Sequence, residues 1–105
     1  MKENENLVQN PYSNYFEHAS QQSNFYPSHL SILVALIHYC NFQDPMLPFN
    51  VSRKKLMLFS RIRSVSTYHK NIRDLVESGL INYKPSWHPK LGSEVKLNIT
   101  LKAAV

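Results

Sequence analysis

The stretch from Ser64 to Gly79, SVSTYHKNIRDLVESG, decides how the rest of this chain is interpreted. Its apolar residues recur at the spacing of an amphipathic helix, which predicts a buried stripe made of Val65, Tyr68, Ile72, Leu75 and Val76. Ser64 is a good N-cap residue, and Gly79 can supply the left-handed turn that ends a helix. The pattern therefore predicts one helix over residues 64–78 with a buried face and an exposed face.

The exposed face of this helix is polar and cationic. The side chains that point away from the apolar stripe, or lie on its flanks, are Ser66, Thr67, His69, Lys70 and Arg73. Hydroxyl, imidazole and cationic groups at the start of a helix are suited to a nucleic-acid groove. The alternative is an ordinary solvated face, since both cations have an acid four residues later, at the spacing of helical ion pairs.

The charge is distributed unevenly along the chain. The whole chain has 105 residues and a formal net charge of +5. Residues 1–27 contain one Lys and three Glu, whereas residues 28–105 contain eleven Lys or Arg and four acids, which leaves charges of −2 and +7. From Arg53 to Arg73 there are seven basic residues and no acid. This surplus favours a polyanionic partner, although many small domains are basic for solubility alone.

The length predicts one domain, which we place at residues 12–105 after a disordered arm over residues 1–11. Cys40 is the only cysteine, so no disulfide forms within the chain, in agreement with a reducing compartment. No signal peptide is evident, and the longest apolar run, Leu30 to Ile37, is too short to cross a bilayer. We expect a cytoplasmic, nucleoid-associated protein that has no contact with a membrane.

Two helices are expected before residue 42. A short one over residues 12–20 places Tyr12, Tyr15, Phe16 and Ala19 on one side. It would pack on its own domain or on a second copy, and we favour its own domain because the segment is short. The second helix begins at Pro27-Ser28 and runs to Asn41 or Phe42. Its apolar stripe consists of Leu30, Leu33, Val34, Ile37 and Cys40.

A third helix is expected over RKKLMLFS, after a connection at residues 42–50 and a short strand at Val51. Ser52 would cap this helix. Leu56, Met57 and Phe59 would face inward. Its first turn carries Arg53, Lys54 and Lys55, and Ile62 forms a buried turn between Arg61 and Arg63. Cations at a helix N-terminus oppose the macrodipole, which is easier to understand if an anion binds nearby.

After Gly79 the apolar period changes from 3.6 to 2. Residues 80–84 and 94–101 read as two strands of an antiparallel hairpin, joined by residues 85–93. The tip would expose Trp87, His88 and Lys90, or Trp87 would fold back over the hairpin. We therefore predict a mainly α fold with a small β-hairpin (α+β). The order of elements is that of a winged helix-turn-helix, a three-helix core plus wing, with an extra short N-terminal helix.

Several segments carry a resemblance to a known group. They are SVSTYHK from Ser64 to Lys70, LVESGLINYKPS from Leu75 to Ser86, PKLGSEV from Pro89 to Val95, YPSHLSILVALIHYCN from Tyr26 to Asn41, and the pair Tyr15-Phe16. Over roughly residues 12–101 the chain resembles small winged-helix proteins and domains of bacterial mobile elements, including regulators of conjugative transposons. The resemblance implies that Ser66, Thr67, His69, Lys70 and Arg73 face the major groove. It also implies a wing over residues 84–93 that contains Lys84, Trp87, His88 and Lys90.

The expected function is therefore sequence-specific binding of double-stranded DNA, in control of transcription or of the excision or transfer of a mobile element. The expected phosphate contacts are Arg53, Lys54, Lys55, Arg61 and Arg63. A single reading domain has a small footprint, so we expect a homodimer formed through residues 12–26 or the first long helix. The alternatives are a winged helix that binds proteins and a replication-initiator-like domain.

An enzyme is not expected. Asp74 and Glu77 share a helix face with no converging base or nucleophile. Gly79 and Gly92 are the only glycines, so there is no glycine-rich loop for phosphate. One cysteine and no close cluster of His, Cys and Asp give no metal site. We expect no cofactor and no small-molecule ligand.

Overall fold

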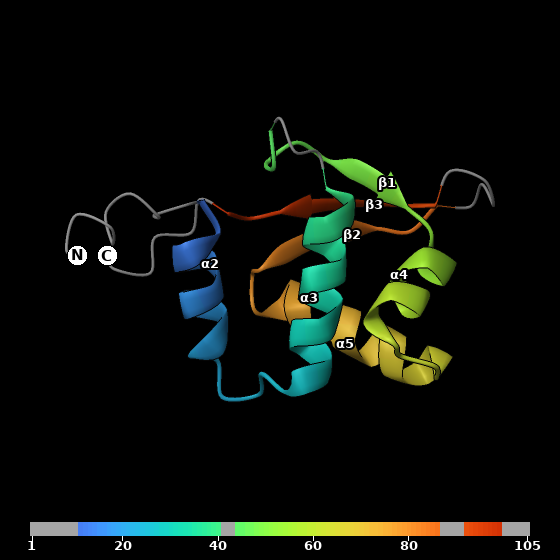
Figure 1. Ribbon diagram of the computed structural model, residues 1–105, viewed down its shortest axis with the longest axis horizontal. Coiled ribbons are helices and arrows are strands. Elements are labelled where there is room, and N and C mark those ends of the chain that lie inside the picture. The colour runs from blue at the N-terminus through green and yellow to red at the C-terminus, as the bar shows by residue number, and fades with distance from the viewer. Residues whose placement is uncertain (1–10, 41–43, 87–91, 100–105) are drawn as a thin grey trace.

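We describe a computed structural model of the chain, which defines residues 11–40, 44–86 and 92–99. Its elements are α2 (Pro11–Ser20), α3 (Pro27–Tyr39), β1 (Phe49–Val51), α4 (Arg53–Ser60), α5 (Val65–Glu77), β2 (Ile81–Lys84) and β3 (Ser93–Leu97). Within these residues the fold is a small α+β arrangement of four helices and one three-stranded antiparallel sheet (Figure 1). The arm expected to be disordered lies outside the described residues, except Pro11, which opens α2.

The sheet has the order β1-β3-β2, so β3 lies in the middle. The expected hairpin is present, with Tyr83 opposite Val95, and β1 pairs with the other edge of β3. Along the predicted strand at residues 94–101, alternate side chains are buried at Val95, Leu97 and Ile99, although β3 itself ends at Leu97. One face of the sheet therefore joins the core. Residues 100 and 101, and the hairpin tip at residues 87–91, lie outside the described part.

The core forms where α3 and α5 meet the sheet. Helix α3 lies in the centre of Figure 1, with α2 on one side and α4 on the other. Helix α3 contacts α4 and α5, and α5 contacts β2. The largest fully buried side chains come from all of these elements and include Ile32, Leu33, Leu36, Leu56, Tyr68, Leu75, Leu80, Ile81 and Leu97. Each fully buried Leu or Ile stabilises the fold by roughly 1.5–3 kcal/mol.

The N-terminal helix packs on its own chain. Tyr15 and Ala19 of α2 are fully buried, and Tyr12 and Phe16 pack against the core. The Tyr15 hydroxyl donates a hydrogen bond to the carbonyl oxygen of Leu80 at 2.8 Å, which ties α2 to the turn before β2. Burial raises the pKa of Tyr15, so this hydroxyl keeps its proton. The predicted helix over residues 12–20 and its packing on its own domain are confirmed.

Two apolar stripes were predicted correctly only in part. The expected burial of Tyr68, Ile72 and Leu75 on α5, and of Leu33 on α3 and Cys40 at its C-cap, is confirmed, but other members of each stripe are exposed. On α5, Val65 and Val76 are 44% and 40% exposed, while the polar Asn71 is buried. The buried face is turned toward Asn71 because its amide accepts from Ser28 Oγ (3.1 Å) and donates to the Thr67 carbonyl (2.9 Å). These bonds satisfy a polar group that would otherwise be costly to bury.

The same effect is seen on the helices before α5. Leu30 and Val34 of α3 are 43% and 42% exposed, and His29 is buried in their place. Phe59 of α4, which was expected to face inward, is 42% exposed and stacks on His38 with ring centroids 4.3 Å apart.

Among the described residues, no helix has the length and apolar content needed to span a membrane.

The two glycines, Gly79 and Gly92, differ in the space that surrounds them. Both have positive φ, +82° at Gly79 and +72° at Gly92. A Cβ at Gly92 would lie 2.6 Å from the backbone oxygen of Val51, whereas one at Gly79 would meet nothing within 4 Å. Gly79→Ala should therefore cost about 1–2 kcal/mol through its left-handed backbone alone. Gly92→Ala should cost more, since the strand-to-helix connection at Val51 must also move. Denaturant titration of both variants tests this difference, and equal losses would contradict it.

Candidate functional site

Seven cations gather on α4, on α5 and on the link between these helices. We call them the basic surface: Arg53, Lys54, Lys55, Arg61, Arg63, Lys70 and Arg73. All seven side chains are exposed. Since no acid occurs between residues 53 and 73, the surface has a local positive charge that is much denser than that of the whole chain.

The α4 end of the basic surface is set by a helix cap. The Ser52 hydroxyl accepts a hydrogen bond from the backbone N–H of Lys55 at 3.1 Å, as predicted. The first turn after this cap carries Arg53, Lys54 and Lys55, which are all exposed to the solvent. The first turn contains no acid, so nothing in it offsets the repulsion between these cations and the helix dipole.

The link between the helices is held from below by one apolar side chain. Ile62 is only 8% exposed, and its backbone N–H donates to the Met57 carbonyl at 3.2 Å. Arg61 ends α4 in the left-handed region, at φ +66°, which is uncommon for a residue with a side chain. Arg61 and Arg63 consequently lie on either side of a buried residue, and both reach the solvent.

Helix α5 presents the polar face that the sequence predicted. Ser64 caps it by accepting from the Thr67 N–H at 3.2 Å. The five side chains expected on the outward face are all exposed: Ser66, Thr67, His69, Lys70 and Arg73. Lys70 lies 3.2 Å from Asp74, the predicted i, i+4 ion pair, whereas Arg73 and Glu77, both within the described part, form none.

A hollow of about 430 Å³ joins this face to the hairpin. Its lining combines the start of α4, one residue of α5 and the base of the hairpin: Ser52, Arg53, Lys54, His69, Tyr83, Pro85, Ser86, Gly92 and Ser93. The structure thus brings His69 and two predicted phosphate contacts together with the hairpin. Lys84 lines a separate hollow with Glu94 and Lys96, so it does not join this group. Trp87, His88 and Lys90 lie outside the described residues.

Helix α5 and the hairpin are also joined by a chain of hydroxyl groups that sequence reasoning missed. The Ser93 hydroxyl donates to Tyr83 Oη at 2.8 Å, and Tyr83 Oη lies 3.2 Å from Tyr68 Oη. Burial, followed by the hydrogen bond with Tyr83, raises the pKa of Tyr68, so the phenol stays neutral. An apolar stripe predicts that Tyr68 is buried, but it contains no signal for the partner of its hydroxyl.

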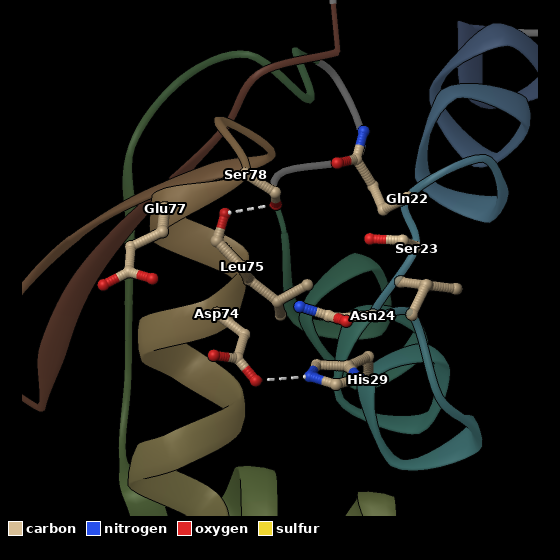
Figure 2. A pocket seen from close by; sticks show the side chains of 9 residues that line it. Gln22, Ser23, Asn24, His29, Asp74, Leu75, Glu77 and Ser78 are labelled. Atoms are coloured by element: carbon tan, nitrogen blue, oxygen red, sulfur yellow. Dashed lines mark hydrogen bonds and ion pairs between the residues drawn. The ribbon is translucent and has the colours of Figure 1, made fainter.

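A second group that the sequence did not reveal lies beneath α5. His29 of α3 and Asp74 of α5 both line a polar pocket of about 210 Å³ and point directly at one another (Figure 2). The Tyr26 N–H donates to His29 Nδ1 at 2.9 Å, so the proton of the neutral ring is on Nε2, which donates to Asp74 Oδ2 at 2.8 Å. Both ring nitrogens are therefore occupied, which leaves neither to accept a proton from a substrate in this arrangement.

The His29 hydrogen bond, together with Lys70, lowers the pKa of the Asp74 carboxyl. Asp74 therefore carries its charge at any pH near neutrality, and it ties the start of α3 to the last turn of α5. Among the described residues, no group of three or more His, Cys, Asp or Glu side chains is placed to hold a metal ion.

Comparison of this chain with known protein families, curated proteins and solved structures found no match.

Asp74→Asn should make the fold less sensitive to acid. The folded-state pKa of Asp74 lies below the unfolded value of about 3.9, so its charge stabilises the fold above that pH. This contribution is lost as the pH falls through the folded-state pKa. The free energy of unfolding, measured by denaturant titration from about pH 6 to about pH 2, should fall less steeply in the variant.

Glu77→Gln is the matched control for this experiment. Glu77 also lines the pocket but points away from His29 (Figure 2), so its removal should leave the acid sensitivity at the wild-type level. Identical pH profiles for the wild-type protein and Asp74→Asn would show that the His29 hydrogen bond does not stabilise the carboxylate.

Proposed function

We propose that this chain is a winged helix-turn-helix protein that binds double-stranded DNA and controls transcription or the excision or transfer of a mobile element. Helix α5 is the reading helix, and the β2–β3 hairpin is the wing. The observation that carries the proposal is the basic surface, whose seven cations are all exposed on α4, on the link and on the outward face of α5, with no acid between residues 53 and 73 of the sequence. Large clusters of one sign on one side of a small domain are typical of nucleic-acid binding.

Capture of the duplex would come first and depend on charge. Arg53, Lys54, Lys55, Arg61 and Arg63 are exposed at the start of α4 and on the link, next to the start of α5. Contacts of such cations with phosphates release counterions and fix the register of the protein on the duplex. A phosphate near the first turn of α4 would also relieve the repulsion between these cations and the helix dipole.

Reading of the sequence would fall to the first two turns of α5. Ser66, Thr67 and Lys70 offer hydrogen-bond donors in the N-terminal half of α5. Arg73 has no ion pair within the described part of the chain, so its guanidinium is available for the two acceptors of a guanine edge. The hydroxyl chain from Tyr68 through Tyr83 to Ser93 supports a fixed angle between the reading helix and the wing.

We further propose that the protein acts as a homodimer on paired half-sites, since one reading helix covers only a few base pairs. We predicted two candidate dimer interfaces, residues 12–26 and the first long helix. Because Tyr15 and Ala19 are buried in their own chain, we favour the exposed side of α3. Sedimentation equilibrium of the free protein and of its duplex complex measures the number of copies.

Binding to a random duplex should weaken steeply as salt is added. If the five cations of α4 and the link each neutralise one phosphate, log K should fall with log salt with a slope of about −4 to −5. Fluorescence anisotropy at a series of salt concentrations measures this slope. No binding at low salt would overturn the proposal and favour a protein-binding role for the same surface.

Arg73→Ala and Lys54→Ala should have different effects. A duplex selected from random sequences by the wild-type protein should lose about tenfold to a hundredfold in affinity with Arg73→Ala, while a random duplex loses much less. Lys54→Ala should weaken both duplexes alike, because a phosphate contact carries no sequence information. Lys96→Ala, on the sheet and outside the basic surface, is the control. Equal losses from Arg73→Ala on both duplexes would remove Arg73 from the reading face.

A further inference from the structure

A groove of about 570 Å³ lies between α4 and the start of α5, within the basic surface. We call it the α4 groove. Its floor is apolar and consists of Met57, Leu58, Ile62 and Val65, and its rim is basic and consists of Arg53, Lys54, Arg61 and Arg63. None of the described residues that line it is acidic.

Two floor residues of the α4 groove, Leu58 and Val65, are the most exposed apolar side chains of α4 and α5. Leu58 is 69% exposed, and Val65 is 44% exposed. Beneath them, Ile62 is buried, so the floor rests on the core and does not need to form on binding. Single exposed apolar side chains are normal on protein surfaces, but several that share one hollow mark a site of contact.

DNA phosphates account for the rim of the groove but not for its floor. A phosphate oxygen has nothing to gain from contact with Leu58, whereas removal of this side chain from water requires an apolar ligand group. The complementary ligand carries negative charges for the rim and at least one apolar side chain for the floor. A protein segment rich in Asp and Glu that contains Leu, Phe or Met has this chemistry.

We propose that the α4 groove binds an acidic segment of a partner protein through an apolar anchor residue. Arg53 and Arg61 on the rim hold its carboxylates, and the anchor covers Leu58 and Val65. The rim cations are also the phosphate contacts of the proposed function. The competition described next therefore rests on that function. Segment and duplex then compete for the same charges, so the partner releases the protein from DNA.

Two labelled peptides test the groove without DNA. One is a synthetic segment of about twelve Asp, Glu and Ser residues with one Leu and one Phe, and the other has Ser in place of both apolar residues. The full chain should bind the first peptide about tenfold more tightly in fluorescence anisotropy, because only this peptide covers the floor. Leu58→Ser and Val65→Ser should each reduce that preference, and Arg61→Ala should weaken both peptides.

Leu47→Ser is the matched control, since Leu47 is a Leu exposed to 47% before β1 and does not line the groove. It should keep the wild-type preference. Because Leu58 is exposed, its replacement should change the free energy of unfolding little, which a thermal melt verifies. Equal binding of the two peptides by the wild-type protein would overturn the proposal, as would an unchanged preference in both floor variants.

Competition is measured separately with a labelled duplex. The unlabelled anchored peptide should displace the duplex, and the Leu58→Ser variant should require a higher peptide concentration for the same displacement. Simultaneous binding of peptide and duplex would overturn the competition. If the chain binds the anchored peptide with the expected preference but no duplex, the proposed function fails, while the α4 groove is upheld as a protein-binding site.

Discussion

Burial of one face of α5 is the contact on which the rest of the structure depends. Tyr68, Ile72 and Leu75 enter the core, and the hydroxyl of Tyr68 meets Tyr83 of the hairpin. On the same face, Asn71 is bonded to Ser28 at the start of α3. These contacts come from three directions and fix the rotation of the helix about its axis. Because the rotation is fixed, the side chains of Ser66, Thr67, His69, Lys70 and Arg73 lie on the solvent side.

The second constraint is electrostatic, since the chain places like charges where the fold gains nothing from them. Three cations occupy the first turn of α4, against its dipole, and Arg61 adopts a left-handed backbone at its end. Neither feature improves the core, because the buried groups of this region are Leu56, Ser60 and Ile62. Such local costs are common at functional sites, where a ligand offsets them. An anionic partner, whether phosphate or carboxylate, is the ligand that would do so here.

Features with a local cause could be predicted from the sequence. Ser52 and Ser64 cap their helices, Gly79 has the left-handed backbone, and the period of 2 in the last strand places Val95 and Leu97 in the core. The predictions were wrong where hydrogen bonds between distant elements decide which side of a helix is buried. His29 and Asn71 are buried because Asp74 and Ser28 satisfy them, so Leu30, Val34, Val65 and Val76 are turned outward. The spacing of apolar residues in the sequence does not reveal these hydrogen-bond partners. The α4 groove was missed for the same reason, since it follows from the outward turn of Val65.

The acids at the end of α5 limit the size of the reading face. Asp74 is kept ionised by His29, and Figure 2 shows Glu77 reaching from the same turn of the helix. A phosphate would be repelled at this end, and the charge of Lys70 is partly neutralised by its ion pair with Asp74. The useful surface of α5 therefore ends at Arg73, about two and a half turns from the cap at Ser64. A face of this length meets only a few base pairs. In the proposed function, selective binding would thus depend on a second copy, and the proposed wing and the rim of the α4 groove would supply affinity more than discrimination.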